Sequence, residues 1–215
     1  MRLSLLALAS ILAAGSSPLL ADDIPYASVG QLAPANALTA SATGTVVGYF
    51  AGSSAGDNDT IELWDKTQNT FSGFVLPNHS STVGDPTTFL SVNAGDTLVF
   101  ILDNVSTGQN EDSVNNNGTP TTWSTDGYNH AYTTAYTAGS IAGLPAGLTG
   151  TYVGMEDLAV TGLDPLTGSD LDYNDDTFVF TDIDPASPTP EPASFVLFGT
   201  GLLGAAGVIR RKFAR

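Results

Sequence analysis

Short runs of β-forming residues, each ended by Gly, Asn, Ser or Thr, fill the sequence from Asp22 to Asp184, and none has the periodicity of an amphipathic helix. Such a chain can bury its apolar residues only by pairing strands into sheets and packing the sheets together. We therefore predict an all-β protein with a single antiparallel β-sandwich of jelly-roll-like form. The expected strands are Thr43–Phe50, Thr60–Asp65, Thr70–Leu76, Thr87–Val92, Thr97–Asp103, Asn129–Thr137, Gly150–Glu156 and Thr177–Thr181.

Two segments should differ from half-buried strands and tight turns. The run Thr97–Leu102 is apolar at consecutive positions, which predicts a central strand covered on both faces. The stretch Ser106–Asp126 contains Asn115-Asn116-Asn117-Gly118, which predicts a long surface loop.

Both ends of the chain are apolar segments flanked by basic residues, so they need separate treatment from the sandwich. Met1–Ala21 has the basic start, apolar run and small-residue end of a secretory signal peptide. Ala193–Ile209 is about long enough to span a bilayer as a helix, with the basic tail on the cytoplasmic side. The expected division is 1–21 signal peptide, 22–42 N-terminal segment, 43–184 β-sandwich, 185–192 Pro-rich linker, 193–209 transmembrane helix and 210–215 basic cytoplasmic tail.

The C-terminal segment has three parts in a fixed order. Pro190-Glu191-Pro192 precedes the apolar run, and Arg210-Arg211-Lys212 follows it. This tail resembles the PEP-CTERM sorting signal of Gram-negative bacteria. The resemblance implies an exported protein that is anchored by its C-terminus, cleaved by an exosortase-type enzyme, and released to the cell surface or an exopolysaccharide matrix. The alternative is an ordinary C-terminal membrane anchor.

The composition excludes several classes of function. The chain has 22 Asp and Glu residues against 6 Lys and Arg, and Lys66 is the one base between Arg2 and Arg210. Because nucleic-acid affinity comes mainly from bases that neutralise phosphates, nucleic acid is not an expected partner. The absence of cysteine excludes a disulfide scaffold, a thiol nucleophile and a thiolate metal site.

Acidic residues are concentrated between Glu156 and Asp184, where no Lys or Arg accompanies them. Within this stretch, Asp170–Asp175 places oxygen ligands at alternate positions, which is the spacing of loops that bind Ca²⁺. Carboxylates this close repel one another unless a cation lies among them. We therefore predict a Ca²⁺ site, and the alternative is a solvated acidic turn. The predicted ligands are Glu156, Asp170, Asp172, Asn174 and Asp175.

The same region resembles a known domain family. Gly154-Met155-Glu156-Asp157-Leu158, the segment Gly168–Asp175 and the upstream Asp126–Ala131 are similar to three segments of the domain of unknown function DUF4114. The similarity is strong over Tyr152–Phe180. The resemblance implies an exported β-sandwich, often calcium-associated, without a known catalytic activity.

One aromatic stripe bears on the choice between functions. Tyr128, His130, Tyr132, Thr134 and Tyr136 share one parity and would form a single face of a strand. We expect this face to be buried, because aromatic residues dominate cores. If it were exposed, it could stack on sugar rings.

We do not expect an enzyme. The candidate nucleophiles are ordinary Ser and Thr residues, and His79 and His130 are too few for a His-rich zinc site. The leading hypothesis is a surface or matrix protein, structural or adhesive, whose sandwich is stabilised by Ca²⁺. The alternative is a carbohydrate-binding or carbohydrate-active module, which an exposed aromatic face or carboxylates facing one another in a deep cleft would favour.

Overall fold

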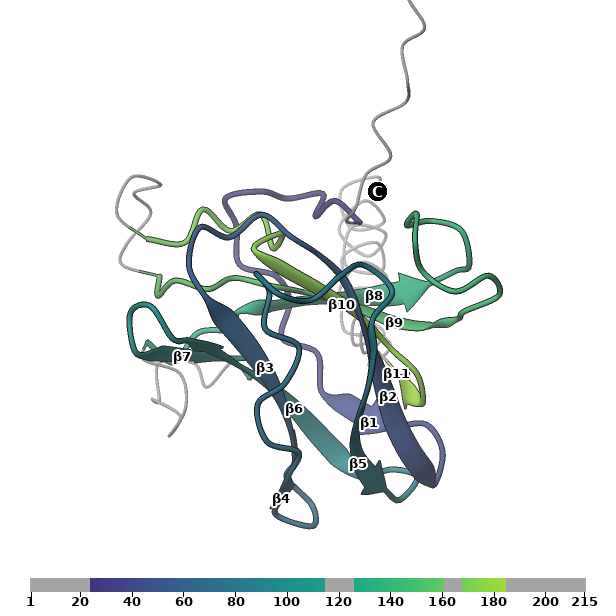
Figure 1. The fold of residues 1–215 in the computed structure, drawn as a ribbon. Coiled ribbons are helices and arrows are strands. Elements are labelled where there is room, and N and C mark those ends of the chain that lie inside the picture. The colour runs from purple at the N-terminus through teal and green to yellow at the C-terminus, as the bar shows by residue number, and fades with distance from the viewer. Residues whose placement is uncertain (1–23, 115–125, 161–167, 185–215) are drawn as a thin grey trace, which may run out of the picture.

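The computed structural model describes residues 24–114, 126–160 and 168–184, which form two antiparallel β-sheets packed against each other (Figure 1). This confirms the all-β prediction. These ranges contain no helix, and so none long and apolar enough to cross a membrane. The predicted signal peptide, linker, transmembrane helix and basic tail lie outside them. The strands are β1 (Leu38–Ala40), β2 (Gly44–Ser53), β3 (Asp59–Asp65), β4 (Thr70–Phe71), β5 (Pro86–Val92), β6 (Thr97–Asn104), β7 (Gln109–Asp112), β8 (Ala131–Tyr136), β9 (Gly150–Met155), β10 (Asp176–Phe180) and β11 (Ile183–Asp184).

Between β1 and β11 the chain passes from one sheet to the other six times. The first sheet has the order β11-β1-β6-β3-β4, and β7 also pairs with β6. The second sheet has the order β5-β2-β10-β9-β8. The steps from β1 to β2 and from β10 to β11 each pass from one sheet to the other, so both ends of the described sandwich are hydrogen-bonded into the first sheet.

Three short strands were not predicted. β1 lies within the expected N-terminal segment, and β11 follows the last expected strand. The prediction of a loop over 106–126 is wrong for Gln109–Asp112, which pairs as β7 with the end of β6. Its residues are all polar, so no apolar alternation marks it; backbone pairing with β6 makes it a strand.

The expected strand Thr70–Leu76 is shorter than predicted. Only Thr70–Phe71 forms β4, and one isolated bridge joins Val75 to Ile61. Gly73 lies between these two contacts with a φ of 79°, outside the range of a strand, and it interrupts the pairing.

β6 is the central strand that its sequence predicts. Leu98, Phe100 and Leu102 belong to the core between the sheets, whereas Val99 and Ile101 are buried on the opposite side of the strand. Burial of each such side chain contributes about 1.5–3 kcal/mol. Both faces of β6 are therefore covered, which confirms the expectation.

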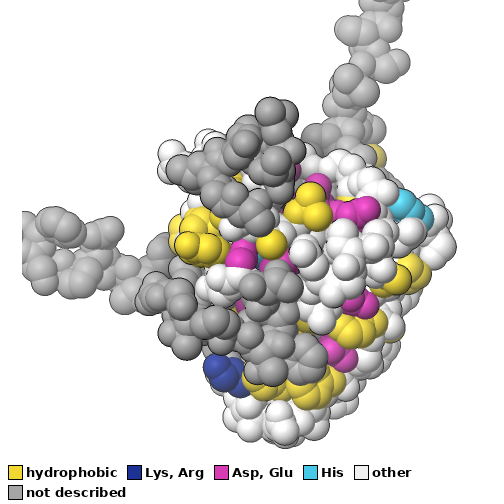
Figure 2. Space-filling model, turned by 90° about the vertical axis from the view of Figure 1, so that its left-hand side faces the viewer, with side chains coloured by type: hydrophobic (Ala, Val, Ile, Leu, Met, Phe, Trp, Pro, Cys, Tyr) yellow, Lys and Arg dark blue, Asp and Glu magenta, His cyan; other side chains and the backbone are white. Residues whose placement is uncertain are grey.

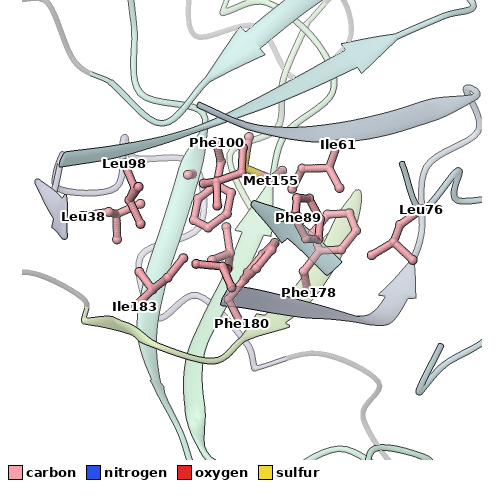
Figure 3. Close-up of a cluster of buried hydrophobic side chains, with 14 of the residues drawn as sticks. Leu38, Ile61, Leu76, Phe89, Leu98, Phe100, Met155, Phe178, Phe180 and Ile183 are labelled. Atoms are coloured by element: carbon pink, nitrogen blue, oxygen red, sulfur yellow. The ribbon is translucent and has the colours of Figure 1, made fainter. Parts of the chain in front are cut away.

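Aromatic rings fill the centre of this core (Figure 3). Phe180 of β10 lies between Phe100 of the first sheet, at a ring-centroid distance of 4.4 Å, and Phe89 of β5, at 5.1 Å. These contacts link three strands from both sheets. β10 is thus at the centre of the second sheet and of the core.

The aromatic stripe is largely buried. His130 and Tyr136 have exposed fractions of 0% and 2%, Tyr132 and Thr134 are half-buried, and Tyr128, which precedes β8, is exposed. Tyr136 and Tyr132 belong to a second hydrophobic cluster, which includes side chains of β2, β9 and β10. The prediction of a buried face is confirmed for His130 and Tyr136 and wrong for Tyr128.

A glycine in β9 lets the acidic loop lie directly on the second sheet. A Cβ atom at Gly154 would come within 2.2 Å of the backbone oxygen of Tyr173. Real Cβ atoms do not approach so closely, and here the obstacle is backbone rather than a movable side chain. The loop that leads into β10 therefore requires glycine at position 154.

We predict that Gly154→Ala destabilises the domain by about 1–3 kcal/mol or more, because the loop must move away from β9. Gly44→Ala in β2 is the matched control, since no heavy atom lies within 4 Å of its Cβ position. Its effect should stay within about 0.5 kcal/mol. Thermal unfolding of both variants measures the difference, and equal melting temperatures would refute the close packing of the loop.

Candidate metal centre

Residues of the predicted calcium loop alternate between buried and exposed positions. Leu171 and Tyr173 are buried, whereas Asp170 is exposed and Asp172 is half-buried. Both buried residues have positive φ, 56° and 58°, a conformation that costs a non-glycine residue about 1–2 kcal/mol. Their side chains pack with Ala33 in a small apolar cluster. Burial of the apolar residues thus leaves the aspartates on the outside of the loop.

Glu156, directly after β9, holds this loop through its own carboxylate. Oε1 accepts a hydrogen bond from the Tyr173 N–H, and Oε2 accepts bonds from the Leu171 N–H (3.1 Å) and the Ser169 hydroxyl. Burial, followed by the charge of Asp175, raises the pKa of Glu156 to about 7, although the bonds from Ser169 and Tyr173 lower it. The side chain is fully buried and has three donors around it.

The structure brings three of the five predicted ligands together. Glu156, Asp170 and Asp172 each offer a carboxylate oxygen within 4.8 Å of the other two. Asn174 lies beside them, because its backbone N–H donates to Asp172 Oδ1 (3.1 Å) and its side-chain amide to Asp172 Oδ2 (2.6 Å). Hard oxygen atoms of this kind suit Ca²⁺.

Asp175, the fifth predicted ligand, contacts a different acid. Its Oδ2 accepts a hydrogen bond from the Asp157 N–H at 3.2 Å. Burial, followed by the charge of Asp157, raises the pKa of Asp175 to about 8, and burial with the charge of Asp59 raises that of Asp157 to about 6. Both acids border a cavity of about 300 Å³. Its lining residues are Gly56, Asp57, Asp157, Leu158, Gly168, Ser169, Asp170 and Asp175.

Two more aspartates are buried next to Asp157 and Asp175, and neither was among the predicted ligands. Asp59 begins β3 and Asp176 begins β10, and their exposed fractions are 1% and 0%. Burial is the main reason why the pKa of each lies well above its usual range. Asp59 Oδ1 and both oxygens of Asp176 accept no hydrogen bond within the described ranges.

A second compact group was also missed. The Nε2 atom of His130 lies 3.0 Å from Glu111 Oε2 and 3.1 Å from both carboxylate oxygens of Asp126. Burial lowers the pKa of His130, but the Asp126 hydrogen bond and the Glu111 charge outweigh it, so the pKa is raised. This buried ion-pair group joins β7 to β8. The spacing of Asp126 and His130 could have indicated half of it, but Glu111 lies in the segment expected to be a loop.

The imbalance of charge is visible at the surface. Figure 2 shows several Asp and Glu side chains between hydrophobic ones on one face, whereas the described residues of that face show a Lys or Arg side chain at one place only. Among all the described residues, Lys66 is the single Lys or Arg. Within the described ranges, Lys66 is therefore the one Lys or Arg side chain with which the acids of the candidate centre could pair.

Comparison with known proteins identifies the tail. Residues 188–212 match the PEP-CTERM protein-sorting motif. No curated protein and no solved structure matches the chain. The match confirms the predicted sorting signal, because Pro190, Glu191, Pro192, Arg210, Arg211 and Lys212 all fall within it. It indicates an exported protein that is anchored in the membrane by its C-terminus before an exosortase processes it.

Proposed function

We propose that the chain is a surface or extracellular-matrix protein with a structural or adhesive role, whose sandwich is stabilised by Ca²⁺ at the loop beside Glu156. The observation that carries the proposal is the convergence of Glu156, Asp170 and Asp172, with oxygens within 4.8 Å of one another. The sorting motif supports export. The resemblance of Tyr152–Phe180 to DUF4114, often calcium-associated, supports the ion, and exopolysaccharide is the proposed partner.

A cation at this loop would stabilise the second sheet through β10. The loop is fastened to β9 by Glu156 and leads directly into Asp176, the first residue of β10. Electrostatic repulsion among Glu156, Asp170 and Asp172 works against this position of the loop. A divalent cation bound among the three carboxylates would turn that repulsion into a net attraction. Because β10 pairs with both β2 and β9, ordering its approach orders the centre of the sheet.

The alternative, a carbohydrate-binding or carbohydrate-active module, has less support. Sugar rings stack on open aromatic faces, but Tyr136 is buried and Tyr132 is half-buried. The cavity near Asp157 and Asp175 does place carboxyl groups together, yet no aromatic residue lines it. A site made only of oxygen atoms fits a hard cation better than a sugar, so we propose a non-enzymatic role.

We predict that Ca²⁺ raises the melting temperature of the chelator-treated full chain. With a Kd of about 10⁻⁴–10⁻³ M, as in extracellular modules, tenfold excess over Kd adds about 1.4 kcal/mol. Asp172→Ala should abolish most of this gain, whereas Asp184→Ala, at an exposed position of β11, should keep it. A wild-type melting temperature that does not change in millimolar Ca²⁺ would falsify the proposal.

We further predict that the chelated protein loses stability as pH rises from 5 to 8. Glu156 and Asp157 have folded-state pKa values of about 7 and about 6, above the ordinary 4.5 and 3.8, so the folded state holds protons more tightly than the unfolded state. The free energy of unfolding is then greatest at pH values below the ordinary pKa values. It declines as pH rises through the raised pKa values, by about 1.4 kcal/mol for each unit of pKa shift. The raised pKa of His130 acts in the same direction.

The measurement is thermal unfolding at pH 5, 6, 7 and 8, with chelator and with Ca²⁺. Bound Ca²⁺ should flatten the decline, because it stabilises the ionised carboxylates. The lowered pKa of Asp126, about 2, affects only more acidic solutions. A chelated protein whose melting temperature rises between pH 5 and pH 8 would contradict the assignment of buried, protonated acids.

A third prediction concerns processing. The mature protein should begin near Asp22 and end near the Pro190-Glu191-Pro192 motif. The N-terminal end has the pattern of a signal peptide, and the C-terminal end carries the sorting motif. Intact-mass measurement of protein extracted from the cell surface tests this. Retention of residues 193–215 in that material would exclude cleavage and leave the tail as a membrane anchor.

A further inference from the structure

Five aspartates from both sheets meet beside the cavity of about 300 Å³. Asp57 and Asp59 lie at the start of β3 in the first sheet, and Asp157, Asp175 and Asp176 lie at the end of β9 and the start of β10 in the second. Asp59 interacts with Asp176 and with Asp157, and Asp157 interacts with Asp175. The cluster thus spans the gap between the two sheets at one end of the sandwich.

The innermost oxygens of this cluster have no donor. Asp176 is fully buried and neither of its oxygens accepts a hydrogen bond, although the Ser53 hydroxyl lies nearby; Asp59 Oδ1 is also unpartnered. Asp59 and Asp176 also lie next to each other, so two buried carboxyl groups meet at this point. A buried polar group left unsatisfied costs about 1–3 kcal/mol, and more if it is charged. A cation in the adjoining cavity would offset the negative charge on these three atoms.

Two asparagines donate hydrogen bonds to acids of this cluster. The Asn78 amide donates to Asp59 Oδ2 at 3.0 Å, and the Asn104 amide donates to Asp57 Oδ2 at 2.9 Å. Each amide fixes one oxygen of a carboxylate and leaves the other oxygen of that group for another partner. The side chains are thus held in place by neutral amide groups, which add no positive charge to the cluster.

Neither Lys66 nor His79 supplies a balancing positive charge to this cluster. Lys66 follows the last residue of β3, whereas Asp59 is the first, so the length of the strand puts them roughly 20 Å apart. His79 interacts with Asp59, but its ring is exposed and its Nε2 contacts the backbone oxygen of Ala55. One exposed imidazole does not balance five carboxyl groups.

We propose that this cavity binds a second Ca²⁺, coordinated directly by Asp157 and Asp175 and attracted by Asp57, Asp59 and Asp176, and that the ion joins β3 of the first sheet to β9 and β10 of the second. The inference rests on the proposed function in taking Ca²⁺ as the ion. The two sites adjoin, because Asp170 of the loop site also borders the cavity. Asp175, expected in the loop site, belongs to this one.

The chemistry of the cavity selects a hydrated hard cation. Its ionisable lining groups are all carboxyl groups, with neither imidazole nor sulfur, and Ca²⁺ takes six to eight oxygen ligands. Within the described ranges, the trios with ligand atoms inside 4.8 Å do not include these aspartates, so water completes the coordination. At about 30 Å³ for each water, the cavity accommodates an ion with several water molecules.

The test is a count of bound Ca²⁺ on the full chain, stripped with chelator and titrated with CaCl₂ in a calorimeter. Wild type should bind two ions. Asp157→Asn, which keeps the shape of the side chain and removes its charge, should bind one, with at least a tenfold loss of affinity for the other. Asp57→Asn is the second cavity variant and should also bind one ion. Asp172→Ala should lose the ion of the loop site instead. The control Asp103→Asn, a half-buried acid of β6 outside the cluster, should bind two.

The melting temperatures of the chelated variants separate loss of the ion from loss of the fold. Asp157→Asn without Ca²⁺ should melt at or above the wild-type temperature, because it removes repulsion, and it should gain less when Ca²⁺ is added. Two ions on both cavity variants would overturn the inference. If wild type binds one ion, and Asp172→Ala loses that ion while Asp157→Asn keeps it, the inference is overturned and the proposed function stands. The reverse pattern would support the cavity site and reject the loop site, and no binding at all would reject both.

Discussion

A buried carboxylate beside β9 determines how the second sheet is completed. Glu156 accepts hydrogen bonds from two backbone N–H groups and one hydroxyl of the loop that follows, and the loop residues adopt positive φ to supply them. That loop delivers the chain to β10, whose Phe180 packs at the centre of the core. Because β10 pairs with two strands, the position of one carboxylate affects the middle of the sandwich. The absence of a Cβ at Gly154 is the complementary requirement.

The sequence predicted best the features that depend on local pattern. The apolar run at 97–102 indicated a central strand because two buried faces require apolar residues at consecutive positions, and β6 is such a strand. The acidic alternation of Asp170 and Asp172 indicated two groups on one side of a loop, and the structure places them together with Glu156. Strand β7 escaped prediction because all four of its residues are polar and its pairing with β6 alone makes it a strand.

A local sequence pattern could not predict contacts between distant segments of the chain. Asp57 and Asp59 precede Asp157 and Asp176 by about a hundred residues, and only the packing of two sheets brings them together. Asp175 shows the same limit within one motif. It follows Asn174 directly, yet it contacts Asp157, because the chain turns there from the loop into β10. Spacing along the chain gives the ligand types, whereas the fold decides which acids share a site.

The arrangement has a consequence for a domain without cysteine. Exported domains are often cross-linked between sheets by disulfides, but this chain contains no residue that could form one. Acids at the start of β3 and the start of β10 place charge where a cross-link between the sheets would act. On the proposal above, these acids hold protons or repel one another when no cation is present, and a bound cation draws the sheets together. At an affinity typical of extracellular modules, the ion binds only where calcium is near millimolar, so on this proposal the domain reaches full stability in the compartment to which its sorting motif directs it.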